Sequence, residues 1–103
     1  MNLLDKAYVL ISPKEPFWKY LSLHLDSLDE LKSFHSPSLY LINEDCWDEE
    51  EWVSSNYQRI SAAESSLFIE PERNVLALES FEQFKTYFSY QLGDVVFDST
   101  QKR

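Results

Sequence analysis

Short apolar runs separated by stretches with helical spacing make up the pattern of this chain. Residues 7–11, AYVLI, are continuously apolar and rich in β-branched and aromatic side chains. Ser12 and Pro13 end the run, which predicts a strand buried on both faces. Residues 39–42, LYLI, and residues 95–97, VVF, predict a second strand and a short last strand.

The first helical pattern covers residues 16–25, where apolar side chains recur at intervals of three and four. A proline opens it, in the first turn, where the missing amide is not needed. Ser27 and Glu30 then have the spacing of a capping box, in which each side chain binds the other's backbone amide. We therefore expect a break near Asp26 and a second short helix that runs through Phe34.

The second helical pattern predicts a long helix at residues 49–67. Asp48 is placed to cap it, and the acids of the first turn suit the positive end of the helix dipole. Its expected apolar stripe consists of Trp52 or Val53, Tyr57, Ile60, Ala63 and Leu67. Residues 70–79 that follow fit either a short strand or an apolar turn.

The third helical pattern covers residues 80–92. Ser80 and Gln83 form another capping box, and phenylalanines follow at helical spacing. Gly93, the only glycine, stands where a helix often ends in a left-handed residue. The last residues, from about 98, predict a polar tail that frays.

These elements predict an α+β (or α/β) fold, in the order β-α-α-β-α-(β)-α-β. Helices between successive strands favour crossover connections, so we expect a small three- or four-stranded, partly parallel sheet packed against three or four helices. The length of 103 residues suits a single compact domain at 1–103.

Composition agrees with a folded, helix-containing chain. Apolar residues make up 44% and aromatic residues 16%, which is ample for a core, whereas one glycine argues against a turn-rich β-sandwich. No apolar stretch reaches the length of a membrane span or of a signal peptide, and one cysteine cannot form an internal disulfide. We therefore expect a cytoplasmic protein.

Negative charge is concentrated in one region of the chain. The net charge is −9, and residues 26–58 contain nine acids and one base, Lys32. Nucleic acids and anionic lipids bind through Lys and Arg, so such a field repels both. The sequence therefore predicts no direct nucleic-acid partner and no membrane partner.

The densest acidic stretch, residues 43–52, reads NEDCWDEEEW. This charge has two interpretations. It serves solubility and stabilises the start of the helix, or it forms a contact surface for a basic protein, with the tryptophans as apolar anchors. The residues predicted for such contact are Glu44, Asp45, Trp47, Asp48, Glu49, Glu50, Glu51 and Trp52. An EF-hand is excluded because it needs a glycine within its loop, whereas a looser cation site at Glu44, Asp45 and Asp48 stays open.

Other chemistry finds little support in the sequence. Cys46 lies near a helix start that would favour a thiolate, but the neighbouring carboxylates oppose it. Neither His24 nor His35 has the spacing of a zinc ligand, and one glycine cannot build a phosphate-binding loop. The serines of the long helix, at positions 54, 55, 61, 65 and 66, are interpreted as its polar face. We predict no cofactor, no metal and no catalytic residue.

Three functions remain open. The leading prediction is a small acidic, non-enzymatic protein that acts by protein–protein contact through the acidic and aromatic region 44–58. A narrower alternative is an inhibitor or immunity protein of a basic enzyme such as a nuclease. The third is a small-ligand-binding or catalytic domain with a pocket between sheet and helices, lined by Tyr8, Tyr40, Tyr87 and His24. Oligomeric state stays open.

Overall fold

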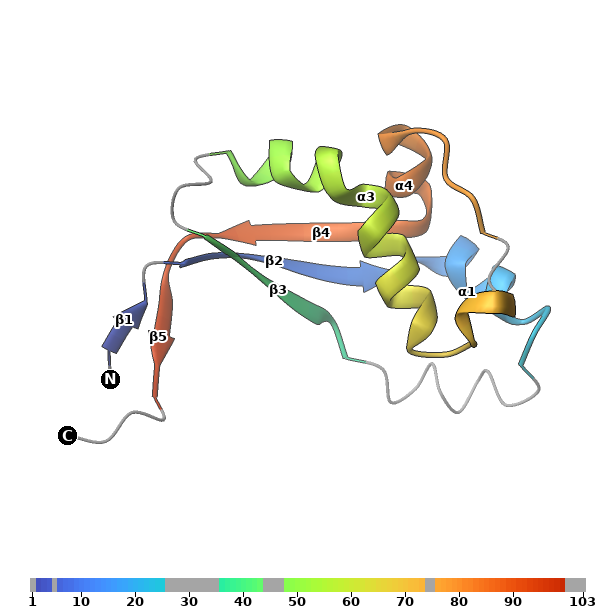
Figure 1. Ribbon diagram of the computed structural model, residues 1–103, viewed down its shortest axis with the longest axis horizontal. Helices are drawn as coiled ribbons and strands as arrows, with labels where there is room; N and C mark the ends of the chain where they lie inside the picture. Colours follow the sequence, from blue (N-terminus) through green and yellow to red (C-terminus); the bar gives the residue numbers. More distant parts are fainter. Residues whose placement is uncertain (1, 5, 26–35, 44–47, 74–75, 100–103) are drawn as a thin grey trace.

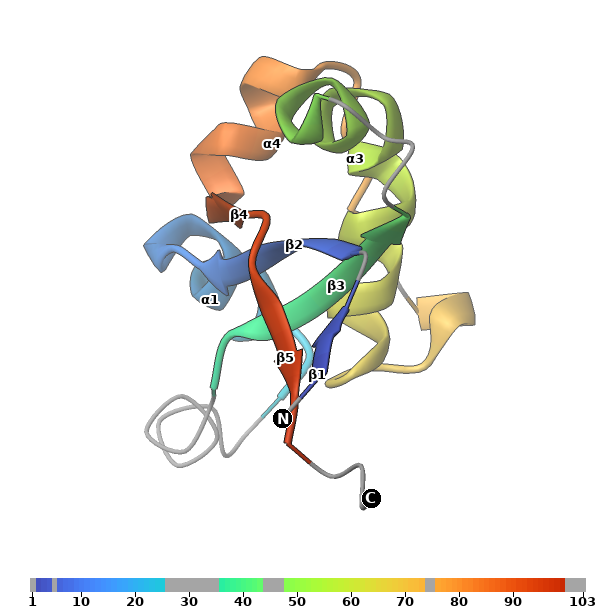
Figure 2. The same cartoon turned by 90° about the vertical axis from the view of Figure 1, so that its left-hand side faces the viewer.

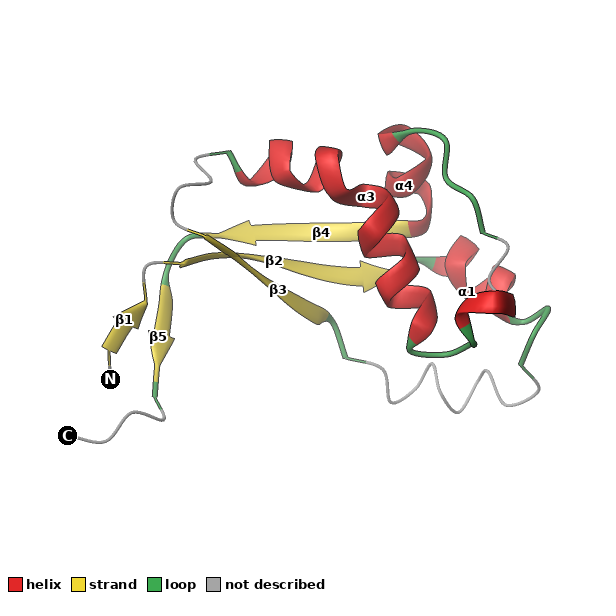
Figure 3. Ribbon diagram, in the orientation of Figure 1, coloured by secondary structure: helices red, strands yellow, loops and turns green. Residues whose placement is uncertain are grey.

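The fold comes from a computed structural model, of which residues 2–4, 6–25, 36–43, 48–73 and 76–99 are described (Figure 1). Figure 3 shows helices together with strands, and the strands form two antiparallel sheets, which confirms the α+β class. The elements are β1 (Asn2–Leu4), β2 (Lys6–Pro13), α1 (Glu15–Leu21), β3 (Ser38–Asn43), α3 (Glu49–Ser66), the 3-10 turn η1 (Pro71–Arg73), α4 (Phe81–Tyr87), β4 (Phe88–Gly93) and β5 (Val96–Asp98).

The main sheet has three strands in the order β3-β2-β4, and every described pairing is antiparallel. The prediction of a partly parallel sheet is therefore wrong. The helices between the strands do not carry the chain across to a parallel neighbour. Each of β3 and β4 instead returns beside the central strand β2 in the opposite direction.

Strand β2 buries only one of its two faces. Ala7, Val9 and Ile11 are buried, whereas the intervening Tyr8 and Leu10 are partly exposed. The expectation of a strand buried on both faces is wrong because α3 and α4 lie over the same side of the sheet, as Figures 1 and 2 show. Alternate residues of each strand therefore face away from the helices.

Aromatic side chains fill the space between the helices and the sheet. Phe17 of α1, Phe84 of α4 and Phe88 of β4 are each at most 1% exposed. The Phe17 and Phe88 ring centroids are 4.7 Å apart, and those of Phe84 and Phe88 are 5.1 Å apart. Such contacts explain the high aromatic content as core packing.

The elements around α1 and η1 differ from the expectations. Helix α1 begins at Glu15, with proline in its first turn, and ends at Leu21, earlier than predicted. The break near Asp26 and the short helix through Phe34 lie outside the described residues. In residues 76–79 the chain is neither helix nor strand, so that stretch connects η1 to α4.

The helix predicted at 80–92 is wrong in its second half. Ser80 caps α4 as predicted, accepting the Gln83 amide at 3.2 Å, but the helix ends at Tyr87 and β4 begins at once. Gly93 is therefore a strand residue, and it does not have a positive φ. A Cβ atom at Gly93 would lie 2.1 Å from Cζ of Tyr8, so the glycine makes room for that ring.

Strands β1 and β5 form a separate two-stranded ladder, which we call the arm. Its register pairs Leu3 with Phe97 and Leu4 with Val96. The arm bends away from the main sheet at the end where both termini lie (Figures 1 and 2). The strand predicted at 95–97 thus exists, shifted by one residue, while β1 was not predicted and most of the expected frayed tail lies outside the described residues.

Candidate functional site

The start of α3 places three glutamates in one helical turn. The helix covers Glu49–Ser66, which confirms the predicted long helix, and its first turn contains Glu49, Glu50 and Glu51. A carboxylate oxygen of Asp48 accepts the backbone N–H of Glu51 at 3.1 Å. The cap and the helix dipole together stabilise the negative charge at this end.

Two acids from distant parts of the chain lie near this region, Asp94 beside Glu49 and Glu82 near Tyr90. The Tyr90 hydroxyl of β4 donates to Oε1 of Glu50 at 2.9 Å, and Glu49 lines one shallow hollow together with Asp94. Glu82 of α4 lies near enough to act on Tyr90 through its charge. We define the acidic surface as Asp48, Glu49, Glu50, Glu51, Glu82 and Asp94.

The acidic surface acts on the ionisation of Tyr90. The pKa of Tyr90 is raised above its ordinary value of 10.0, first by partial burial, then by the hydrogen bond to Glu50, and also by the charges of Glu50 and Glu82. Lys85 forms an ion pair with Glu82 at 2.8 Å and lies 5.1 Å from the centre of the Phe81 ring. The surface is thus negative, with one lysine at its margin.

The structure describes only part of the predicted contact set. Glu44, Asp45 and Trp47 lie outside the described residues, as does Cys46. Trp52 is half-buried and packs against the core, with its ring centroid 6.4 Å from that of Tyr40. It therefore supports the α3–sheet contact and is not a free apolar anchor.

Two members of the acidic surface were missed in the sequence. Glu82 and Asp94 follow the long acidic stretch by about thirty and forty residues, and neither belongs to a dense acidic run. Strand β4 and the residues after it bring Asp94 beside Glu49 at the start of α3, whereas Glu82 of α4 lies near Tyr90 of β4. No sequence pattern would have indicated that proximity.

A second polar cluster lies inside the fold. Glu64 of α3 is 1% exposed, and its two carboxylate oxygens accept the Tyr40 hydroxyl at 2.6 Å and the Ser38 hydroxyl at 3.1 Å. Burial, followed by the hydrogen bond to Glu64 and the charge of Glu64, strongly raises the pKa of Tyr40. This cluster joins the last turns of α3 to β3.

The buried side of α3 is more polar than predicted. Ser61 and Ser65 are at most 3% exposed, so they do not belong to a solvated helix face, whereas Leu67, expected in the apolar stripe, is 60% exposed. Within the described residues, the hydroxyls of Ser61 and Ser65 have no hydrogen-bond partner.

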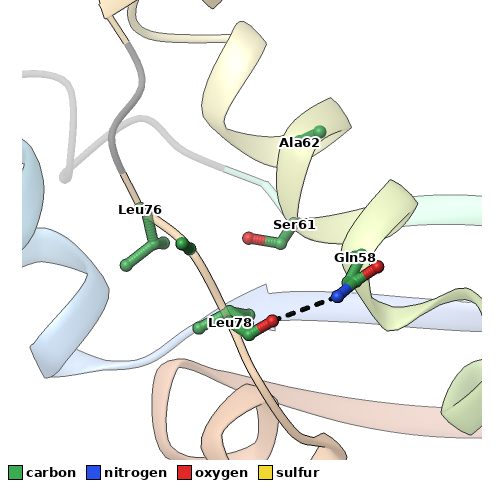
Figure 4. Close-up of a pocket in the computed structure, with 6 residues that line it drawn as sticks. Gln58, Ser61, Ala62, Leu76 and Leu78 are labelled. Atoms are coloured by element: carbon green, nitrogen blue, oxygen red, sulfur yellow. Dashed lines mark hydrogen bonds between the residues drawn. The ribbon is translucent and has the colours of Figure 1, made fainter.

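A small cavity of about 260 Å³ lies between α3 and residues 76–78. Figure 4 shows the Ser61 hydroxyl directed toward that segment, with the Gln58 side chain donating to the Leu78 carbonyl at 3.2 Å. Its remaining lining is Ala62, Leu76 and Ala77. The lining has no ionisable side chain, so Ser61 lacks the base that a nucleophilic serine needs.

The predicted ligand pocket is not assembled as expected. Tyr8 and Tyr40 occupy opposite faces of the sheet, because Tyr40 pairs with the inward-facing Val9 and Tyr8 with the outward-facing Leu41. The His24 ring packs instead against Tyr20, at 5.2 Å between centroids. The four side chains named for that pocket therefore do not line one cavity.

The described residues also bear on metal and membrane binding. Among them, no three His, Cys, Asp or Glu side chains lie close enough together to hold a metal ion. Within the same residues, no helix is both long and apolar enough to cross a membrane.

Comparison of the chain with protein families, with curated proteins and with solved structures gave no match. The fold defines the chain as an α+β protein with helices on one face of an antiparallel sheet. A fold of this class hosts many functions, so the functional argument rests on the site.

Proposed function

We propose that this chain acts by protein–protein contact and that its acidic surface receives a positively charged partner protein. The observation that supports this is that acids from separate elements lie close together, with Asp94 beside Glu49 and with Glu50 and Glu82 near Tyr90. Helix capping and solubility need one or two acids at a helix start and do not require acids from other elements beside them.

The proposed contact depends mainly on charge. Trp52 and Tyr57 pack against the core, so the described part of the surface offers few free apolar anchors. Exposed carboxylates accelerate encounter with a basic partner, and this effect weakens as salt screens the charges. Tyr90, whose hydroxyl donates to Glu50, and Leu92 are likewise partly buried against the core.

The experiment compares three versions of the chain as baits for partner proteins. The site variant carries Glu49→Gln, Glu50→Gln and Glu51→Gln. The matched control carries Glu70→Gln, Glu72→Gln and Glu79→Gln, three exposed acids outside the acidic surface. Both variants lose the same net charge, so any difference between them reports position.

The proposal predicts a set of basic proteins recovered by the wild-type chain and by the control but lost with the site variant. Equal recovery by all three baits would remove the basis of the proposal. If the recovered partner is a basic enzyme such as a nuclease, its activity in the presence of the chain distinguishes an inhibitor from a passive binding partner.

A further inference from the structure

The sheet face opposite the helices carries an uncovered apolar strip. Leu39 and Leu41 of β3 are 55% and 52% exposed, and the register places Leu10 and Tyr8 of β2 beside them. Among the outward positions of β2, β3 and β4, Lys6 is the only charged side chain. We call this strip of four side chains the outer face.

The arm carries a second uncovered apolar group. Leu3 and Phe97 form a cross-strand pair and are 61% and 59% exposed, and Val95 at the base of the arm is 59% exposed. In Figures 1 and 2 the arm bends toward the side opposite α3 and α4, which is the side of the outer face. A two-stranded ladder is marginally stable alone, so this one gains stability from any surface that covers it.

We propose that a second copy of this chain covers both groups, with the arm of each copy packed on the outer face of the other. The two groups do not bury each other within one chain, since Leu3, Phe97, Leu39 and Leu41 all remain more than half exposed. One chain thus provides both an apolar arm and an apolar outer face. A two-fold axis pairs the arm of each copy with the outer face of the other.

The distribution of charge favours a second copy of this chain, over a basic protein or anionic lipid, as the partner that covers the outer face. Two chains of net charge −9 repel each other unless they meet where acids are few. The outward positions of β2, β3 and β4 include Lys6 and no acid, and the described arm contains one acid, Asp98, at the end of β5. A basic protein would select the acidic surface instead, and the lone lysine gives anionic lipid little attraction.

The apolar area indicates a reversible dimer. Each of the five side chains Leu3, Leu39, Leu41, Val95 and Phe97 leaves on the order of 100 Å² exposed, so each copy offers roughly 500 Å² of strongly exposed apolar surface. Flanking Tyr8 and Leu10 add to it. A standard interface buries about 800 Å² per partner, so this one belongs to the small, weaker class.

The test is analytical ultracentrifugation of the full chain over roughly 10 to 500 micromolar, the range in which small interfaces associate. The outer-face variant is Leu39→Ser with Leu41→Ser, and the arm variant is Leu3→Ser with Phe97→Ser. The control, Leu23→Ser with Leu67→Ser, changes two leucines that are 79% and 60% exposed outside both groups.

The proposal predicts a mass that approaches twice the monomer value with concentration for wild type and control. Each of the other two variants weakens the dimer at least tenfold. A chain that stays monomeric throughout, or a control that weakens association as much, overturns the proposal.

A second measurement does not depend on any variant. In a mixture of isotope-labelled and unlabelled wild-type chains, nuclear Overhauser effects between copies connect the Phe97 ring to the Leu39 and Leu41 methyl groups. A dimer without these contacts also overturns the proposal. Because neither group includes the acidic surface, partner capture by the outer-face variant stays at the wild-type level, which separates this proposal from the proposed function.

Discussion

The buried Glu64 cluster allows a quantitative test of the packing of α3 on β3. Tyr40→Phe removes the hydroxyl that donates to a carboxylate oxygen of Glu64 at 2.6 Å. Glu64 itself is only 1% exposed. A hydrogen bond to a buried charged group contributes about 1.5 to 3 kcal/mol. With Ser38 as the remaining donor, we expect Tyr40→Phe to lower the free energy of unfolding by about 2 kcal/mol.

The double-mutant cycle with Glu64→Gln isolates the contribution of the charge. The amide introduced by Glu64→Gln is neutral, so its carbonyl accepts from Tyr40 in a neutral hydrogen bond that contributes about 1 kcal/mol. We therefore expect Tyr40→Phe to cost about half as much in the Glu64→Gln background, with a coupling energy of about 1 kcal/mol.

Urea unfolding of the four chains, followed by circular dichroism, measures each free energy. Tyr57→Phe is the matched control, because the Tyr57 side chain packs against Phe81 and Phe84 and its change should stay within about 0.5 kcal/mol. A loss from Tyr40→Phe that is the same in both backgrounds, or no larger than that of the control, would refute the role assigned to the Glu64 carboxylate.

Three further predictions concern Ser65, Gly93 and the ionisation of Tyr40. Ser65→Ala removes a fully buried hydroxyl without a described partner and should raise the free energy of unfolding by about 1 kcal/mol; a loss in urea unfolding would show that the hydroxyl is satisfied. Gly93→Ala should lower the free energy of unfolding of the wild-type chain by about 1 kcal/mol because the added methyl group displaces the Tyr8 ring. In a Tyr8→Ala background the same substitution should have no such cost, and an equal cost in both backgrounds would contradict the steric account. The raised pKa of Tyr40 means that the folded state retains the phenolic proton more strongly than the unfolded state does. The free energy of unfolding should therefore be at its full value below the ordinary pKa of 10.0 and fall as the pH rises above it. Between neutral and alkaline pH, thermal melts should show a smaller loss of stability for Tyr40→Phe than for the wild-type chain.

Local signals in the sequence were enough to define the long helix and the strands β2 and β3. Asp48 caps α3 through its own side chain, so the start of that helix depends on a contact three residues away. Gly93 shows the limit of the same reasoning. Its place after a helical run suggested a helix end, but β4 requires glycine because Tyr8, far away in sequence, lies across it.

The directions of the strands, the burial of Glu64 and the membership of the acidic surface depend on contacts between residues distant in sequence, and local sequence patterns do not indicate such contacts. Helix α1 lies between β2 and β3, and α3 and α4 lie between β3 and β4; such helical connections are equally compatible with a parallel crossover and with an antiparallel return. Glu64 was missed because a glutamate in a serine-rich helix is usually solvated, and only its donors on β3 reveal that it is buried. The acidic surface was found through the density of charge at α3, but its distant members were not.

The most direct test of the contact hypothesis is to map the bound surface by amide chemical shifts. The isotope-labelled chain would be titrated with the partner recovered by the bait experiment, at low and at high salt. We expect the largest shifts at Glu49–Glu51, Glu82 and residues 90–94, with an affinity that falls as salt rises. Shifts confined to residues remote from these positions, with an affinity independent of salt, would contradict the account.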